Sequence, residues 1–174
     1  WLSNTNLFYK KGWFGYCVDL DENKLLWFRI CRRKKVKTIC AAVVENTYKK
    51  KYITVYKFNR KFLFSEVDTV SKNIANKVAQ FRSGFYKKIK IKSEKINELF
   101  KKVGKINFLK IDIEGLDEKV ILSSNLSLID PNVILYEDNN TFYPSKKIEQ
   151  FMKKRNYFLL FISGGSKCYA KKIK

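Results

Sequence analysis

Four acidic residues in this sequence stand where short apolar runs end. They are Asp19, Asp112 and the adjacent pair Glu137 and Asp138. Ligands of an open parallel sheet bind outside the carboxyl ends of its strands, so a carboxylate at such an end is a candidate ligand contact. The chain contains no histidine, which excludes Ser-His-Asp and Cys-His mechanisms. A general base must therefore be a carboxylate, lysine, tyrosine or cysteine.

Asp19 has two possible roles. An acid that closes a strand of a nucleotide-binding unit can accept hydrogen bonds from both ribose hydroxyls. Asp21 and Glu22 follow it closely, however, and a group of acids also complements the dipole at the start of a helix. The sequence alone leaves both roles open.

Lys110, Asp112 and Glu114 alternate with apolar residues over 107–115. Residues two apart on an extended chain point the same way, so these three side chains are predicted to share one face. At the end of a buried strand they need partners or a ligand. The alternatives are a ligand site, a mutual salt-bridge set, or a turn at Ile113 that exposes Glu114. As a site, the pair Asp112 and Glu114 supplies two candidate bases.

Glu137 is a third candidate base at the same expected sheet edge, and capping of the next element is the alternative. Asp112, Glu137 and Asp138 could also supply oxygen ligands to a hard divalent cation at this edge. We expect no metal site.

The pattern of apolar residues predicts strands that alternate with helices. Strands are expected at 14–19, 36–44, 52–58, 88–92, 106–113 and 133–137, and helices at 3–11, 22–31, 71–81, 93–102 (capped by Ser93), 116–123 and 145–155. A hairpin of 157–163 and 167–171 closes the chain through Gly164 and Gly165. This alternation predicts a single α/β domain over 1–174, with a mainly parallel sheet, helices on both faces and a C-terminal antiparallel hairpin. Residues 59–87 are a candidate insertion or lid.

The composition is strongly basic, with 37 Lys and Arg against 16 Asp and Glu and a net charge of +21. Such a charge suits an anionic partner, whether nucleic acid, a membrane surface or an acidic glycan. Heavy use of Lys, Ile and Asn, with basic residues in short scattered pieces, favours compositional drift instead, and we expect no nucleic-acid partner. The longest apolar runs are strand-length, so no transmembrane segment is expected. Four cysteines without C-x-x-C spacing indicate free thiols and a cytoplasmic protein.

Three segments of the chain resemble successive core blocks of the FkbM family of methyltransferases. They are Gly12 to Asp19, Phe108 to Asp117, and Val133 to Asp138, in the family's order. The family's middle block reads K-I-D-V-E-G, then a small residue and an acid. Lys110 to Asp117 match it with Ile for Val and Asp for Glu.

The resemblance implies a Rossmann-like, S-adenosylmethionine-dependent O-methyltransferase. Its acceptor would be a hydroxyl of a sugar, a glycan or a small natural product. The residues implied to contact the cofactor are Ser3, Asn4, Asp19, Ala41 and Asp112, and the implied catalytic residues are Asp112, Glu114 and Glu137.

The chain departs from the family pattern at its start. The family opens with a strand and a D-x-G-A-N-x-G loop, which would stand just before Ser3, and the seven glycines of this chain form no such loop. We therefore expect an incomplete domain whose first strand lies upstream of Trp1, and cofactor binding by the chain as printed stays open. The rival class is a non-catalytic basic module that binds RNA or an anionic glycan on the same fold.

Overall fold

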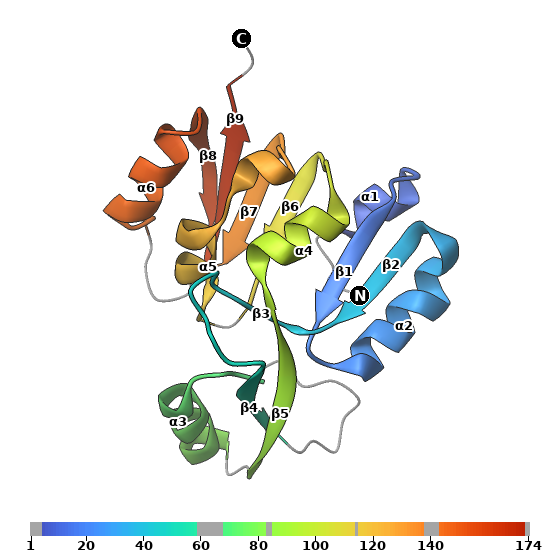
Figure 1. Cartoon of the computed structure of the whole chain (residues 1–174), viewed down its shortest axis with the longest axis vertical. Helices are drawn as coiled ribbons and strands as arrows, with labels where there is room; N and C mark the ends of the chain where they lie inside the picture. Colours follow the sequence, from blue (N-terminus) through green and yellow to red (C-terminus); the bar gives the residue numbers. More distant parts are fainter. Residues whose placement is uncertain (1–4, 59–67, 83–84, 114, 138–142, 173–174) are drawn as a thin grey trace. The chain divides into compact units, whose positions relative to one another are not determined.

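A computed structural model describes residues 5–58, 68–82, 85–113, 115–137 and 143–172 (Figure 1). The chain divides into two compact units, Trp1–Ala42 and Val43–Lys174, which are described separately. No helix among the described residues has the length and apolar character that crossing a membrane requires.

The first unit is built on a β-α-β arrangement. Its elements are α1 (Asn6–Lys10), β1 (Gly15–Asp19), α2 (Glu22–Arg32), a 3-10 turn η1 (Arg33–Lys35) and β2 (Val36–Cys40). Strands β1 and β2 pair in parallel, with Asp19 opposite Cys40. Helix α2 begins at its Asp21 cap, whose side chain accepts the backbone N–H of Asn23, and it buries Leu25.

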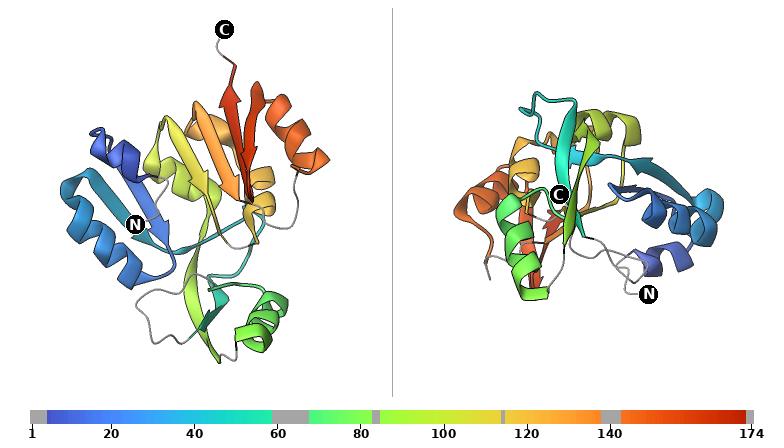
Figure 2. Two further views of the ribbon diagram at one scale, coloured as in Figure 1. Left: turned by 180° about the vertical axis from the view of Figure 1, so that it is seen from behind. Right: turned by 90° about the horizontal axis from the view of Figure 1, so that it is seen from below.

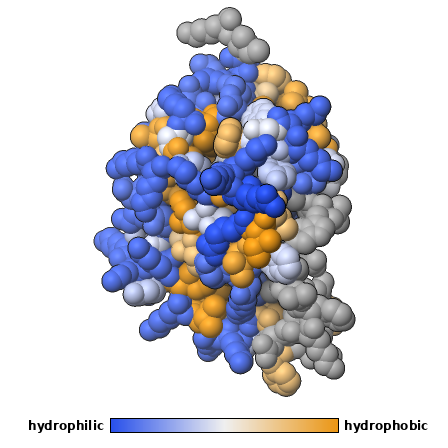
Figure 3. All heavy atoms as spheres, turned by 90° about the vertical axis from the view of Figure 1, so that its right-hand side faces the viewer, coloured by the Kyte–Doolittle hydropathy of each residue, from blue (hydrophilic) through white to orange (hydrophobic). Residues whose placement is uncertain are grey.

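Large apolar side chains remain at the surface of this unit. Phe14, Leu7 and Ile30 are more than half exposed. Figure 3 shows apolar residues between hydrophilic ones on one face of the molecule.

The second unit contains a small sheet in the order β3-β5-β4. Its strands are β3 (Ala42–Val44, which begins at the unit boundary), β4 (Tyr52–Phe58) and β5 (Tyr86–Lys95), and α3 (Lys72–Arg82) lies between β4 and β5 in the chain. Strands β4 and β5 form an antiparallel ribbon, in which Tyr52 pairs with Lys92 and Phe58 with Tyr86.

A four-stranded sheet in the order β6-β7-β9-β8 forms the rest of this unit. The strands are β6 (Phe108–Ile111), β7 (Val133–Glu137), β8 (Tyr157–Ser163) and β9 (Ser166–Lys171), and the helical elements are α4 (Ile96–Val103), α5 (Asp117–Ser123), the 3-10 turn η2 (Leu126–Leu128) and α6 (Lys146–Lys153). Figure 2 shows the four strands side by side from behind. Strands β6 and β7 are parallel, and the other two pairs are antiparallel. The core includes the fully buried Val120, Ile134, Ile148 and Met152.

These observations confirm a mixed α/β architecture, the C-terminal hairpin, and helices near 71–81, 116–123 and 145–155. The single, mainly parallel sheet is not what the described residues show. They form three hydrogen-bonded sheets, with parallel pairing in β1/β2 and β6/β7.

Two local predictions are wrong. The strand expected over 36–44 divides at Ala41, whose N–H donates to the Asp19 carbonyl at 3.1 Å, and β3 then joins another sheet. Ser93 does not cap a helix, because β5 continues through it to Lys95. Its backbone N–H donates to the Lys51 carbonyl at 3.0 Å, and its hydroxyl donates to the Lys50 carbonyl. The proposed insertion over 59–87 includes α3, while 59–67 and 83–84 lie outside the described residues.

Candidate functional site

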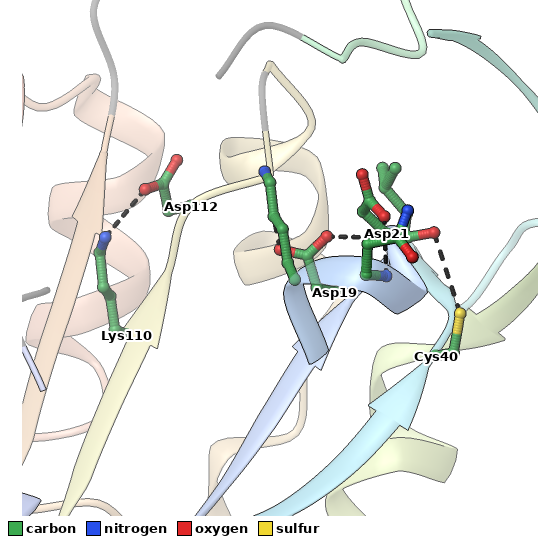
Figure 4. A network of polar contacts seen from close by, with 8 residues as sticks. Asp19, Asp21, Cys40, Lys110 and Asp112 are labelled. Carbon is green, nitrogen blue, oxygen red and sulfur yellow. Dashed lines mark hydrogen bonds and ion pairs between the residues drawn. The ribbon is translucent and has the colours of Figure 1, made fainter. Parts of the chain in front are cut away.

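Asp19 is the last residue of β1, and its side chain is 29% exposed. Its Oδ1 accepts the backbone N–H of Asp21 at 2.8 Å, and its Oδ2 lies 4.0 Å from the Lys24 ammonium (Figure 4). The helix cap is Asp21, so Asp19 is not the capping residue of α2. Asp19 orders the turn before the helix and keeps part of its carboxylate at the surface.

Ala41 follows β2, the parallel neighbour of β1, and is almost completely buried. Its backbone N–H donates a hydrogen bond to the Asp19 carbonyl, as described above. The two candidate cofactor contacts Asp19 and Ala41 are therefore linked through their backbones. Ser3 and Asn4 lie outside the described residues. A cofactor contact by any of these four residues remains a prediction.

Two cysteines of this unit, Cys17 and Cys40, do not suit a nucleophilic role. Burial raises the pKa of the Cys17 thiol to about 11, and the negative charge of Asp19 adds to the effect. Burial is also the main reason that the pKa of Cys40 is raised. Because the thiolate is the nucleophile, both sulfur atoms stay protonated and unreactive near neutral pH.

In the second unit, Asp112 directly follows β6 and forms an ion pair with Lys110. The Nζ–Oδ2 distance is 2.8 Å, and the two side chains are 35% and 27% exposed (Figure 4). The contact confirms that Lys110 and Asp112 share a face. Asp112 is not part of the strand expected over 106–113, because β6 ends at Ile111, and its side chain is partly exposed. Glu114 lies outside the described residues.

The turn after Asp112 is held by a residue that the sequence did not single out, Asp117. Its two carboxylate oxygens accept the backbone N–H groups of Ile113 and Gly115, each at 3.1 Å. Gly115 has φ +96°, a conformation that favours glycine. Burial raises the pKa of Asp117, and the two backbone hydrogen bonds oppose that shift. The signal in the sequence was its place as the acid that ends the block Lys110 to Asp117.

Glu137 is the last residue of β7, the parallel neighbour of β6. Ile111 pairs with Tyr136, so Asp112 and Glu137 occupy neighbouring positions at one edge of the sheet. Asp138 lies outside the described residues. Within the described part of the chain, no three Cys, Asp or Glu side chains gather in a way that could hold a metal ion.

Two parallel strand pairs thus carry carboxylates at their carboxyl ends, Asp19 in the first unit and Asp112 with Glu137 in the second. A family profile, the methyltransferase FkbM domain, matches residues 1–159. The chain belongs to the FkbM methyltransferase family. No curated protein and no solved structure gives a significant match.

Membership of the FkbM family confirms the resemblance drawn from three sequence blocks. In the structure the first block leads into and forms β1, and the third forms β7. The middle block contains β6, the turn held by Asp117 and the start of α5. This block therefore contains both the Lys110–Asp112 ion pair and the two backbone hydrogen bonds that Asp117 accepts.

Proposed function

We propose that the chain is an S-adenosylmethionine-dependent O-methyltransferase domain, acting on a hydroxyl of a sugar, a glycan or a small natural product. The family match supports methyl transfer as the activity. The observation that carries the proposal further is Asp112, an accessible carboxylate at the end of a parallel strand, oriented by Lys110.

The bound donor would supply a methyl group on a sulfonium, open to in-line attack. Asp19 suits the donor's ribose, because it closes β1, stays partly exposed, and is held by the N–H of Asp21. Ser3, Asn4, Ala41 and Asp112 are the further candidate contacts.

An alcohol must lose its proton as it attacks, and Asp112 is our candidate for the base. Lys110 engages Oδ2, and Oδ1 has no hydrogen-bond partner among the described residues. One oxygen is thus fixed while the other can accept a proton from the acceptor hydroxyl. Glu114 and Glu137 are the other candidates.

Asp117 is a positioning residue in this scheme. It touches no reacting atom but holds the backbone of Ile113 and Gly115, directly after Asp112. A shift of about 1 Å in a catalytic group can lower a rate about 10²-fold, so a fixed turn has kinetic value.

The test is transfer of an isotope-labelled methyl group from S-adenosylmethionine by the full-length protein to panels of sugars, glycans and hydroxylated natural products. Labelled product with a new ether methyl group is the expected result. Product methylated only at nitrogen or carbon would refute the O-methyltransferase assignment. Saturable cofactor binding with no transfer to any panel would refute the acceptor class.

A further inference from the structure

The positive charge of this chain is concentrated in one segment. Residues 46–93 contain 13 Lys and Arg against two acids, which is +11 of the total +21 in 48 of 174 residues. The segments before and after it carry +5 each. Compositional drift would spread the excess of basic residues evenly along the chain. This uneven distribution therefore argues against the drift that the short basic pieces suggested. A local excess of this kind points to an anionic partner.

The start of β5 presents much of this charge. Lys87, Lys88 and Lys90 are exposed, and none of the three forms an ion pair with a described residue. Of the two acids, Asp68 is buried and accepts the Phe58 N–H at 3.1 Å, so it does not offset the surface charge. The other, Glu66, lies outside the described residues.

Two phenylalanines flank the connection from α3 to β5. Phe81 is 88% and Phe85 90% exposed, which makes them the most exposed large apolar side chains among the described residues. Phe81 lies near the end of α3, and Phe85 directly precedes β5. Phenylalanine has no polar atom, so full exposure to water is unfavourable unless another phase covers the ring.

We propose that Phe81 and Phe85, together with Lys88 and Lys90 on one face of β5, form a surface that binds the face of an anionic phospholipid membrane. The two rings would enter the boundary between headgroups and acyl chains, and the lysines would contact anionic headgroups. The positive charge of the lysines indicates an anionic partner. The exposed rings of Phe81 and Phe85 indicate that this partner has an apolar layer that the rings can enter.

Single-stranded RNA is the competing partner, because it also contacts lysine and aromatic side chains. On such platforms the rings that stack bases lie along the basic groove. Phe81 and Phe85 lie instead on either side of a connection, outside the paired rows of β4 and β5. This placement favours insertion into a layer over stacking along a strand.

The test is co-sedimentation of the full chain with vesicles. One preparation is phosphatidylcholine with about 30 mol% phosphatidylserine, and the other is phosphatidylcholine alone. The charge variant is Lys88→Gln with Lys90→Gln, and its matched control is Lys146→Gln with Lys147→Gln, an exposed pair on α6. The apolar variant is Phe85→Ser, and its control is Phe14→Ser, which is 79% exposed.

Binding is expected only with phosphatidylserine and should weaken as salt is raised. The charge variant should lower the water-to-vesicle partition coefficient about 10- to 30-fold in total, since each lysine contributes about tenfold or less. Phe85→Ser should lower it several-fold, and both controls should bind as the wild type does. Each substituted side chain is exposed, so thermal melts should be unchanged.

Three results would overturn the proposal: equal binding to uncharged vesicles, equal losses in the controls, or no effect of Phe85→Ser. The last result, together with binding of a single-stranded RNA oligonucleotide that the charge variant abolishes, would assign the surface to a soluble polyanion. The inference is independent of the proposed methyl transfer, which the labelled-methyl assay tests without membranes.

Discussion

The carboxylate of Asp117 accepts the backbone N–H of Ile113, four residues earlier in the chain, at 3.1 Å. Its second oxygen accepts the N–H of Gly115. Neither donor belongs to a strand or a helix, so the turn that follows Asp112 depends on this side chain for its backbone hydrogen bonds. A buried acid that reads in the sequence as a first-turn helix residue is thus part of the candidate site's framework.

Replacement of this residue tests that role. Asp117→Ala should lower the free energy of unfolding by about 2–3 kcal/mol, because two backbone donors lose a buried acceptor. Urea unfolding measures the change. The control is Glu118→Ala, the adjacent acid, which loses one hydrogen bond from the Ser145 hydroxyl and should cost about 1 kcal/mol or less. Equal losses of unfolding free energy in the two variants would show that Asp117 does not stabilise the turn more than a neighbouring acid does.

The strands that carry the candidate site could be predicted because their signals are local. Short apolar runs that end in an acid correctly located β1, β6 and β7, and the alternation of Lys110 and Asp112 correctly predicted a shared face. The closing hairpin was equally clear, since two adjacent glycines separate its strands, and Gly164 takes a positive φ of 56° in the turn.

Features that depend on distant partners could not be read in the same way. The division of 36–44 at Ala41 results from a hydrogen bond to Asp19, and most of β5 pairs with β4, at least 28 residues earlier in the chain. The role of Asp117 depends on where the turn places two N–H groups. Hydrophobic periodicity contains none of this information.

A second prediction concerns the ribose contact proposed for Asp19. Asp19→Asn keeps an oxygen that can accept the Asp21 N–H but removes the charge, so the turn should survive. Affinity for S-adenosylmethionine should fall by about 1–3 kcal/mol, the scale of lost charge-assisted hydrogen bonds. Calorimetry on the full-length protein measures it. The control Asp21→Ala should cost about 1 kcal/mol of stability through loss of the cap and leave affinity unchanged. Unchanged affinity in Asp19→Asn would restrict Asp19 to the turn.

Two buried tyrosines make a matched pair for a third prediction. The Tyr169 hydroxyl has no hydrogen-bond partner among the described residues, whereas the Tyr157 hydroxyl donates to the Pro131 carbonyl. Tyr169→Phe should therefore leave stability unchanged or raise it by about 0.5–1 kcal/mol, and Tyr157→Phe should lower it by about 1 kcal/mol. Chemical unfolding at neutral pH compares them. A clear loss in Tyr169→Phe would mean that its hydroxyl is satisfied in the folded protein.

The same two residues should set part of the alkaline limit of stability. Burial raises the pKa of each to about 12 from the usual 10.0, with further contributions from Asp130 at Tyr157 and Glu149 at Tyr169. The unfolded chain loses these protons near pH 10, whereas the folded chain keeps them to about pH 12. Their stabilising contribution is complete below pH 10 and is lost as pH rises to 12. Urea midpoints from pH 9 to 12 should fall less steeply in the double Tyr-to-Phe variant, and parallel curves would contradict the shifts.

The last prediction concerns Asp112 as a base. Asp112→Asn is nearly isosteric, and the ion pair that it weakens is partly exposed, so it should cost at most about 1 kcal/mol of stability. Turnover should nevertheless fall about 10²-fold or more, the usual range for loss of a general base. Single-turnover methyl transfer by the full-length protein at saturating cofactor measures this step apart from cofactor binding.

Two companion variants locate the effect at Asp112. Glu114→Gln should act more mildly if Glu114 only orients the acceptor, and Glu137→Gln tests the neighbouring carboxylate at the same sheet edge. A thermal melt accompanies each assay. Full activity in Asp112→Asn would remove Asp112 as the base, and a large loss in Glu137→Gln would transfer the role to Glu137. A fall in melting temperature that matches the fall in activity would mean that the pair of Lys110 and Asp112 is structural, contrary to the small contribution expected of a partly exposed ion pair.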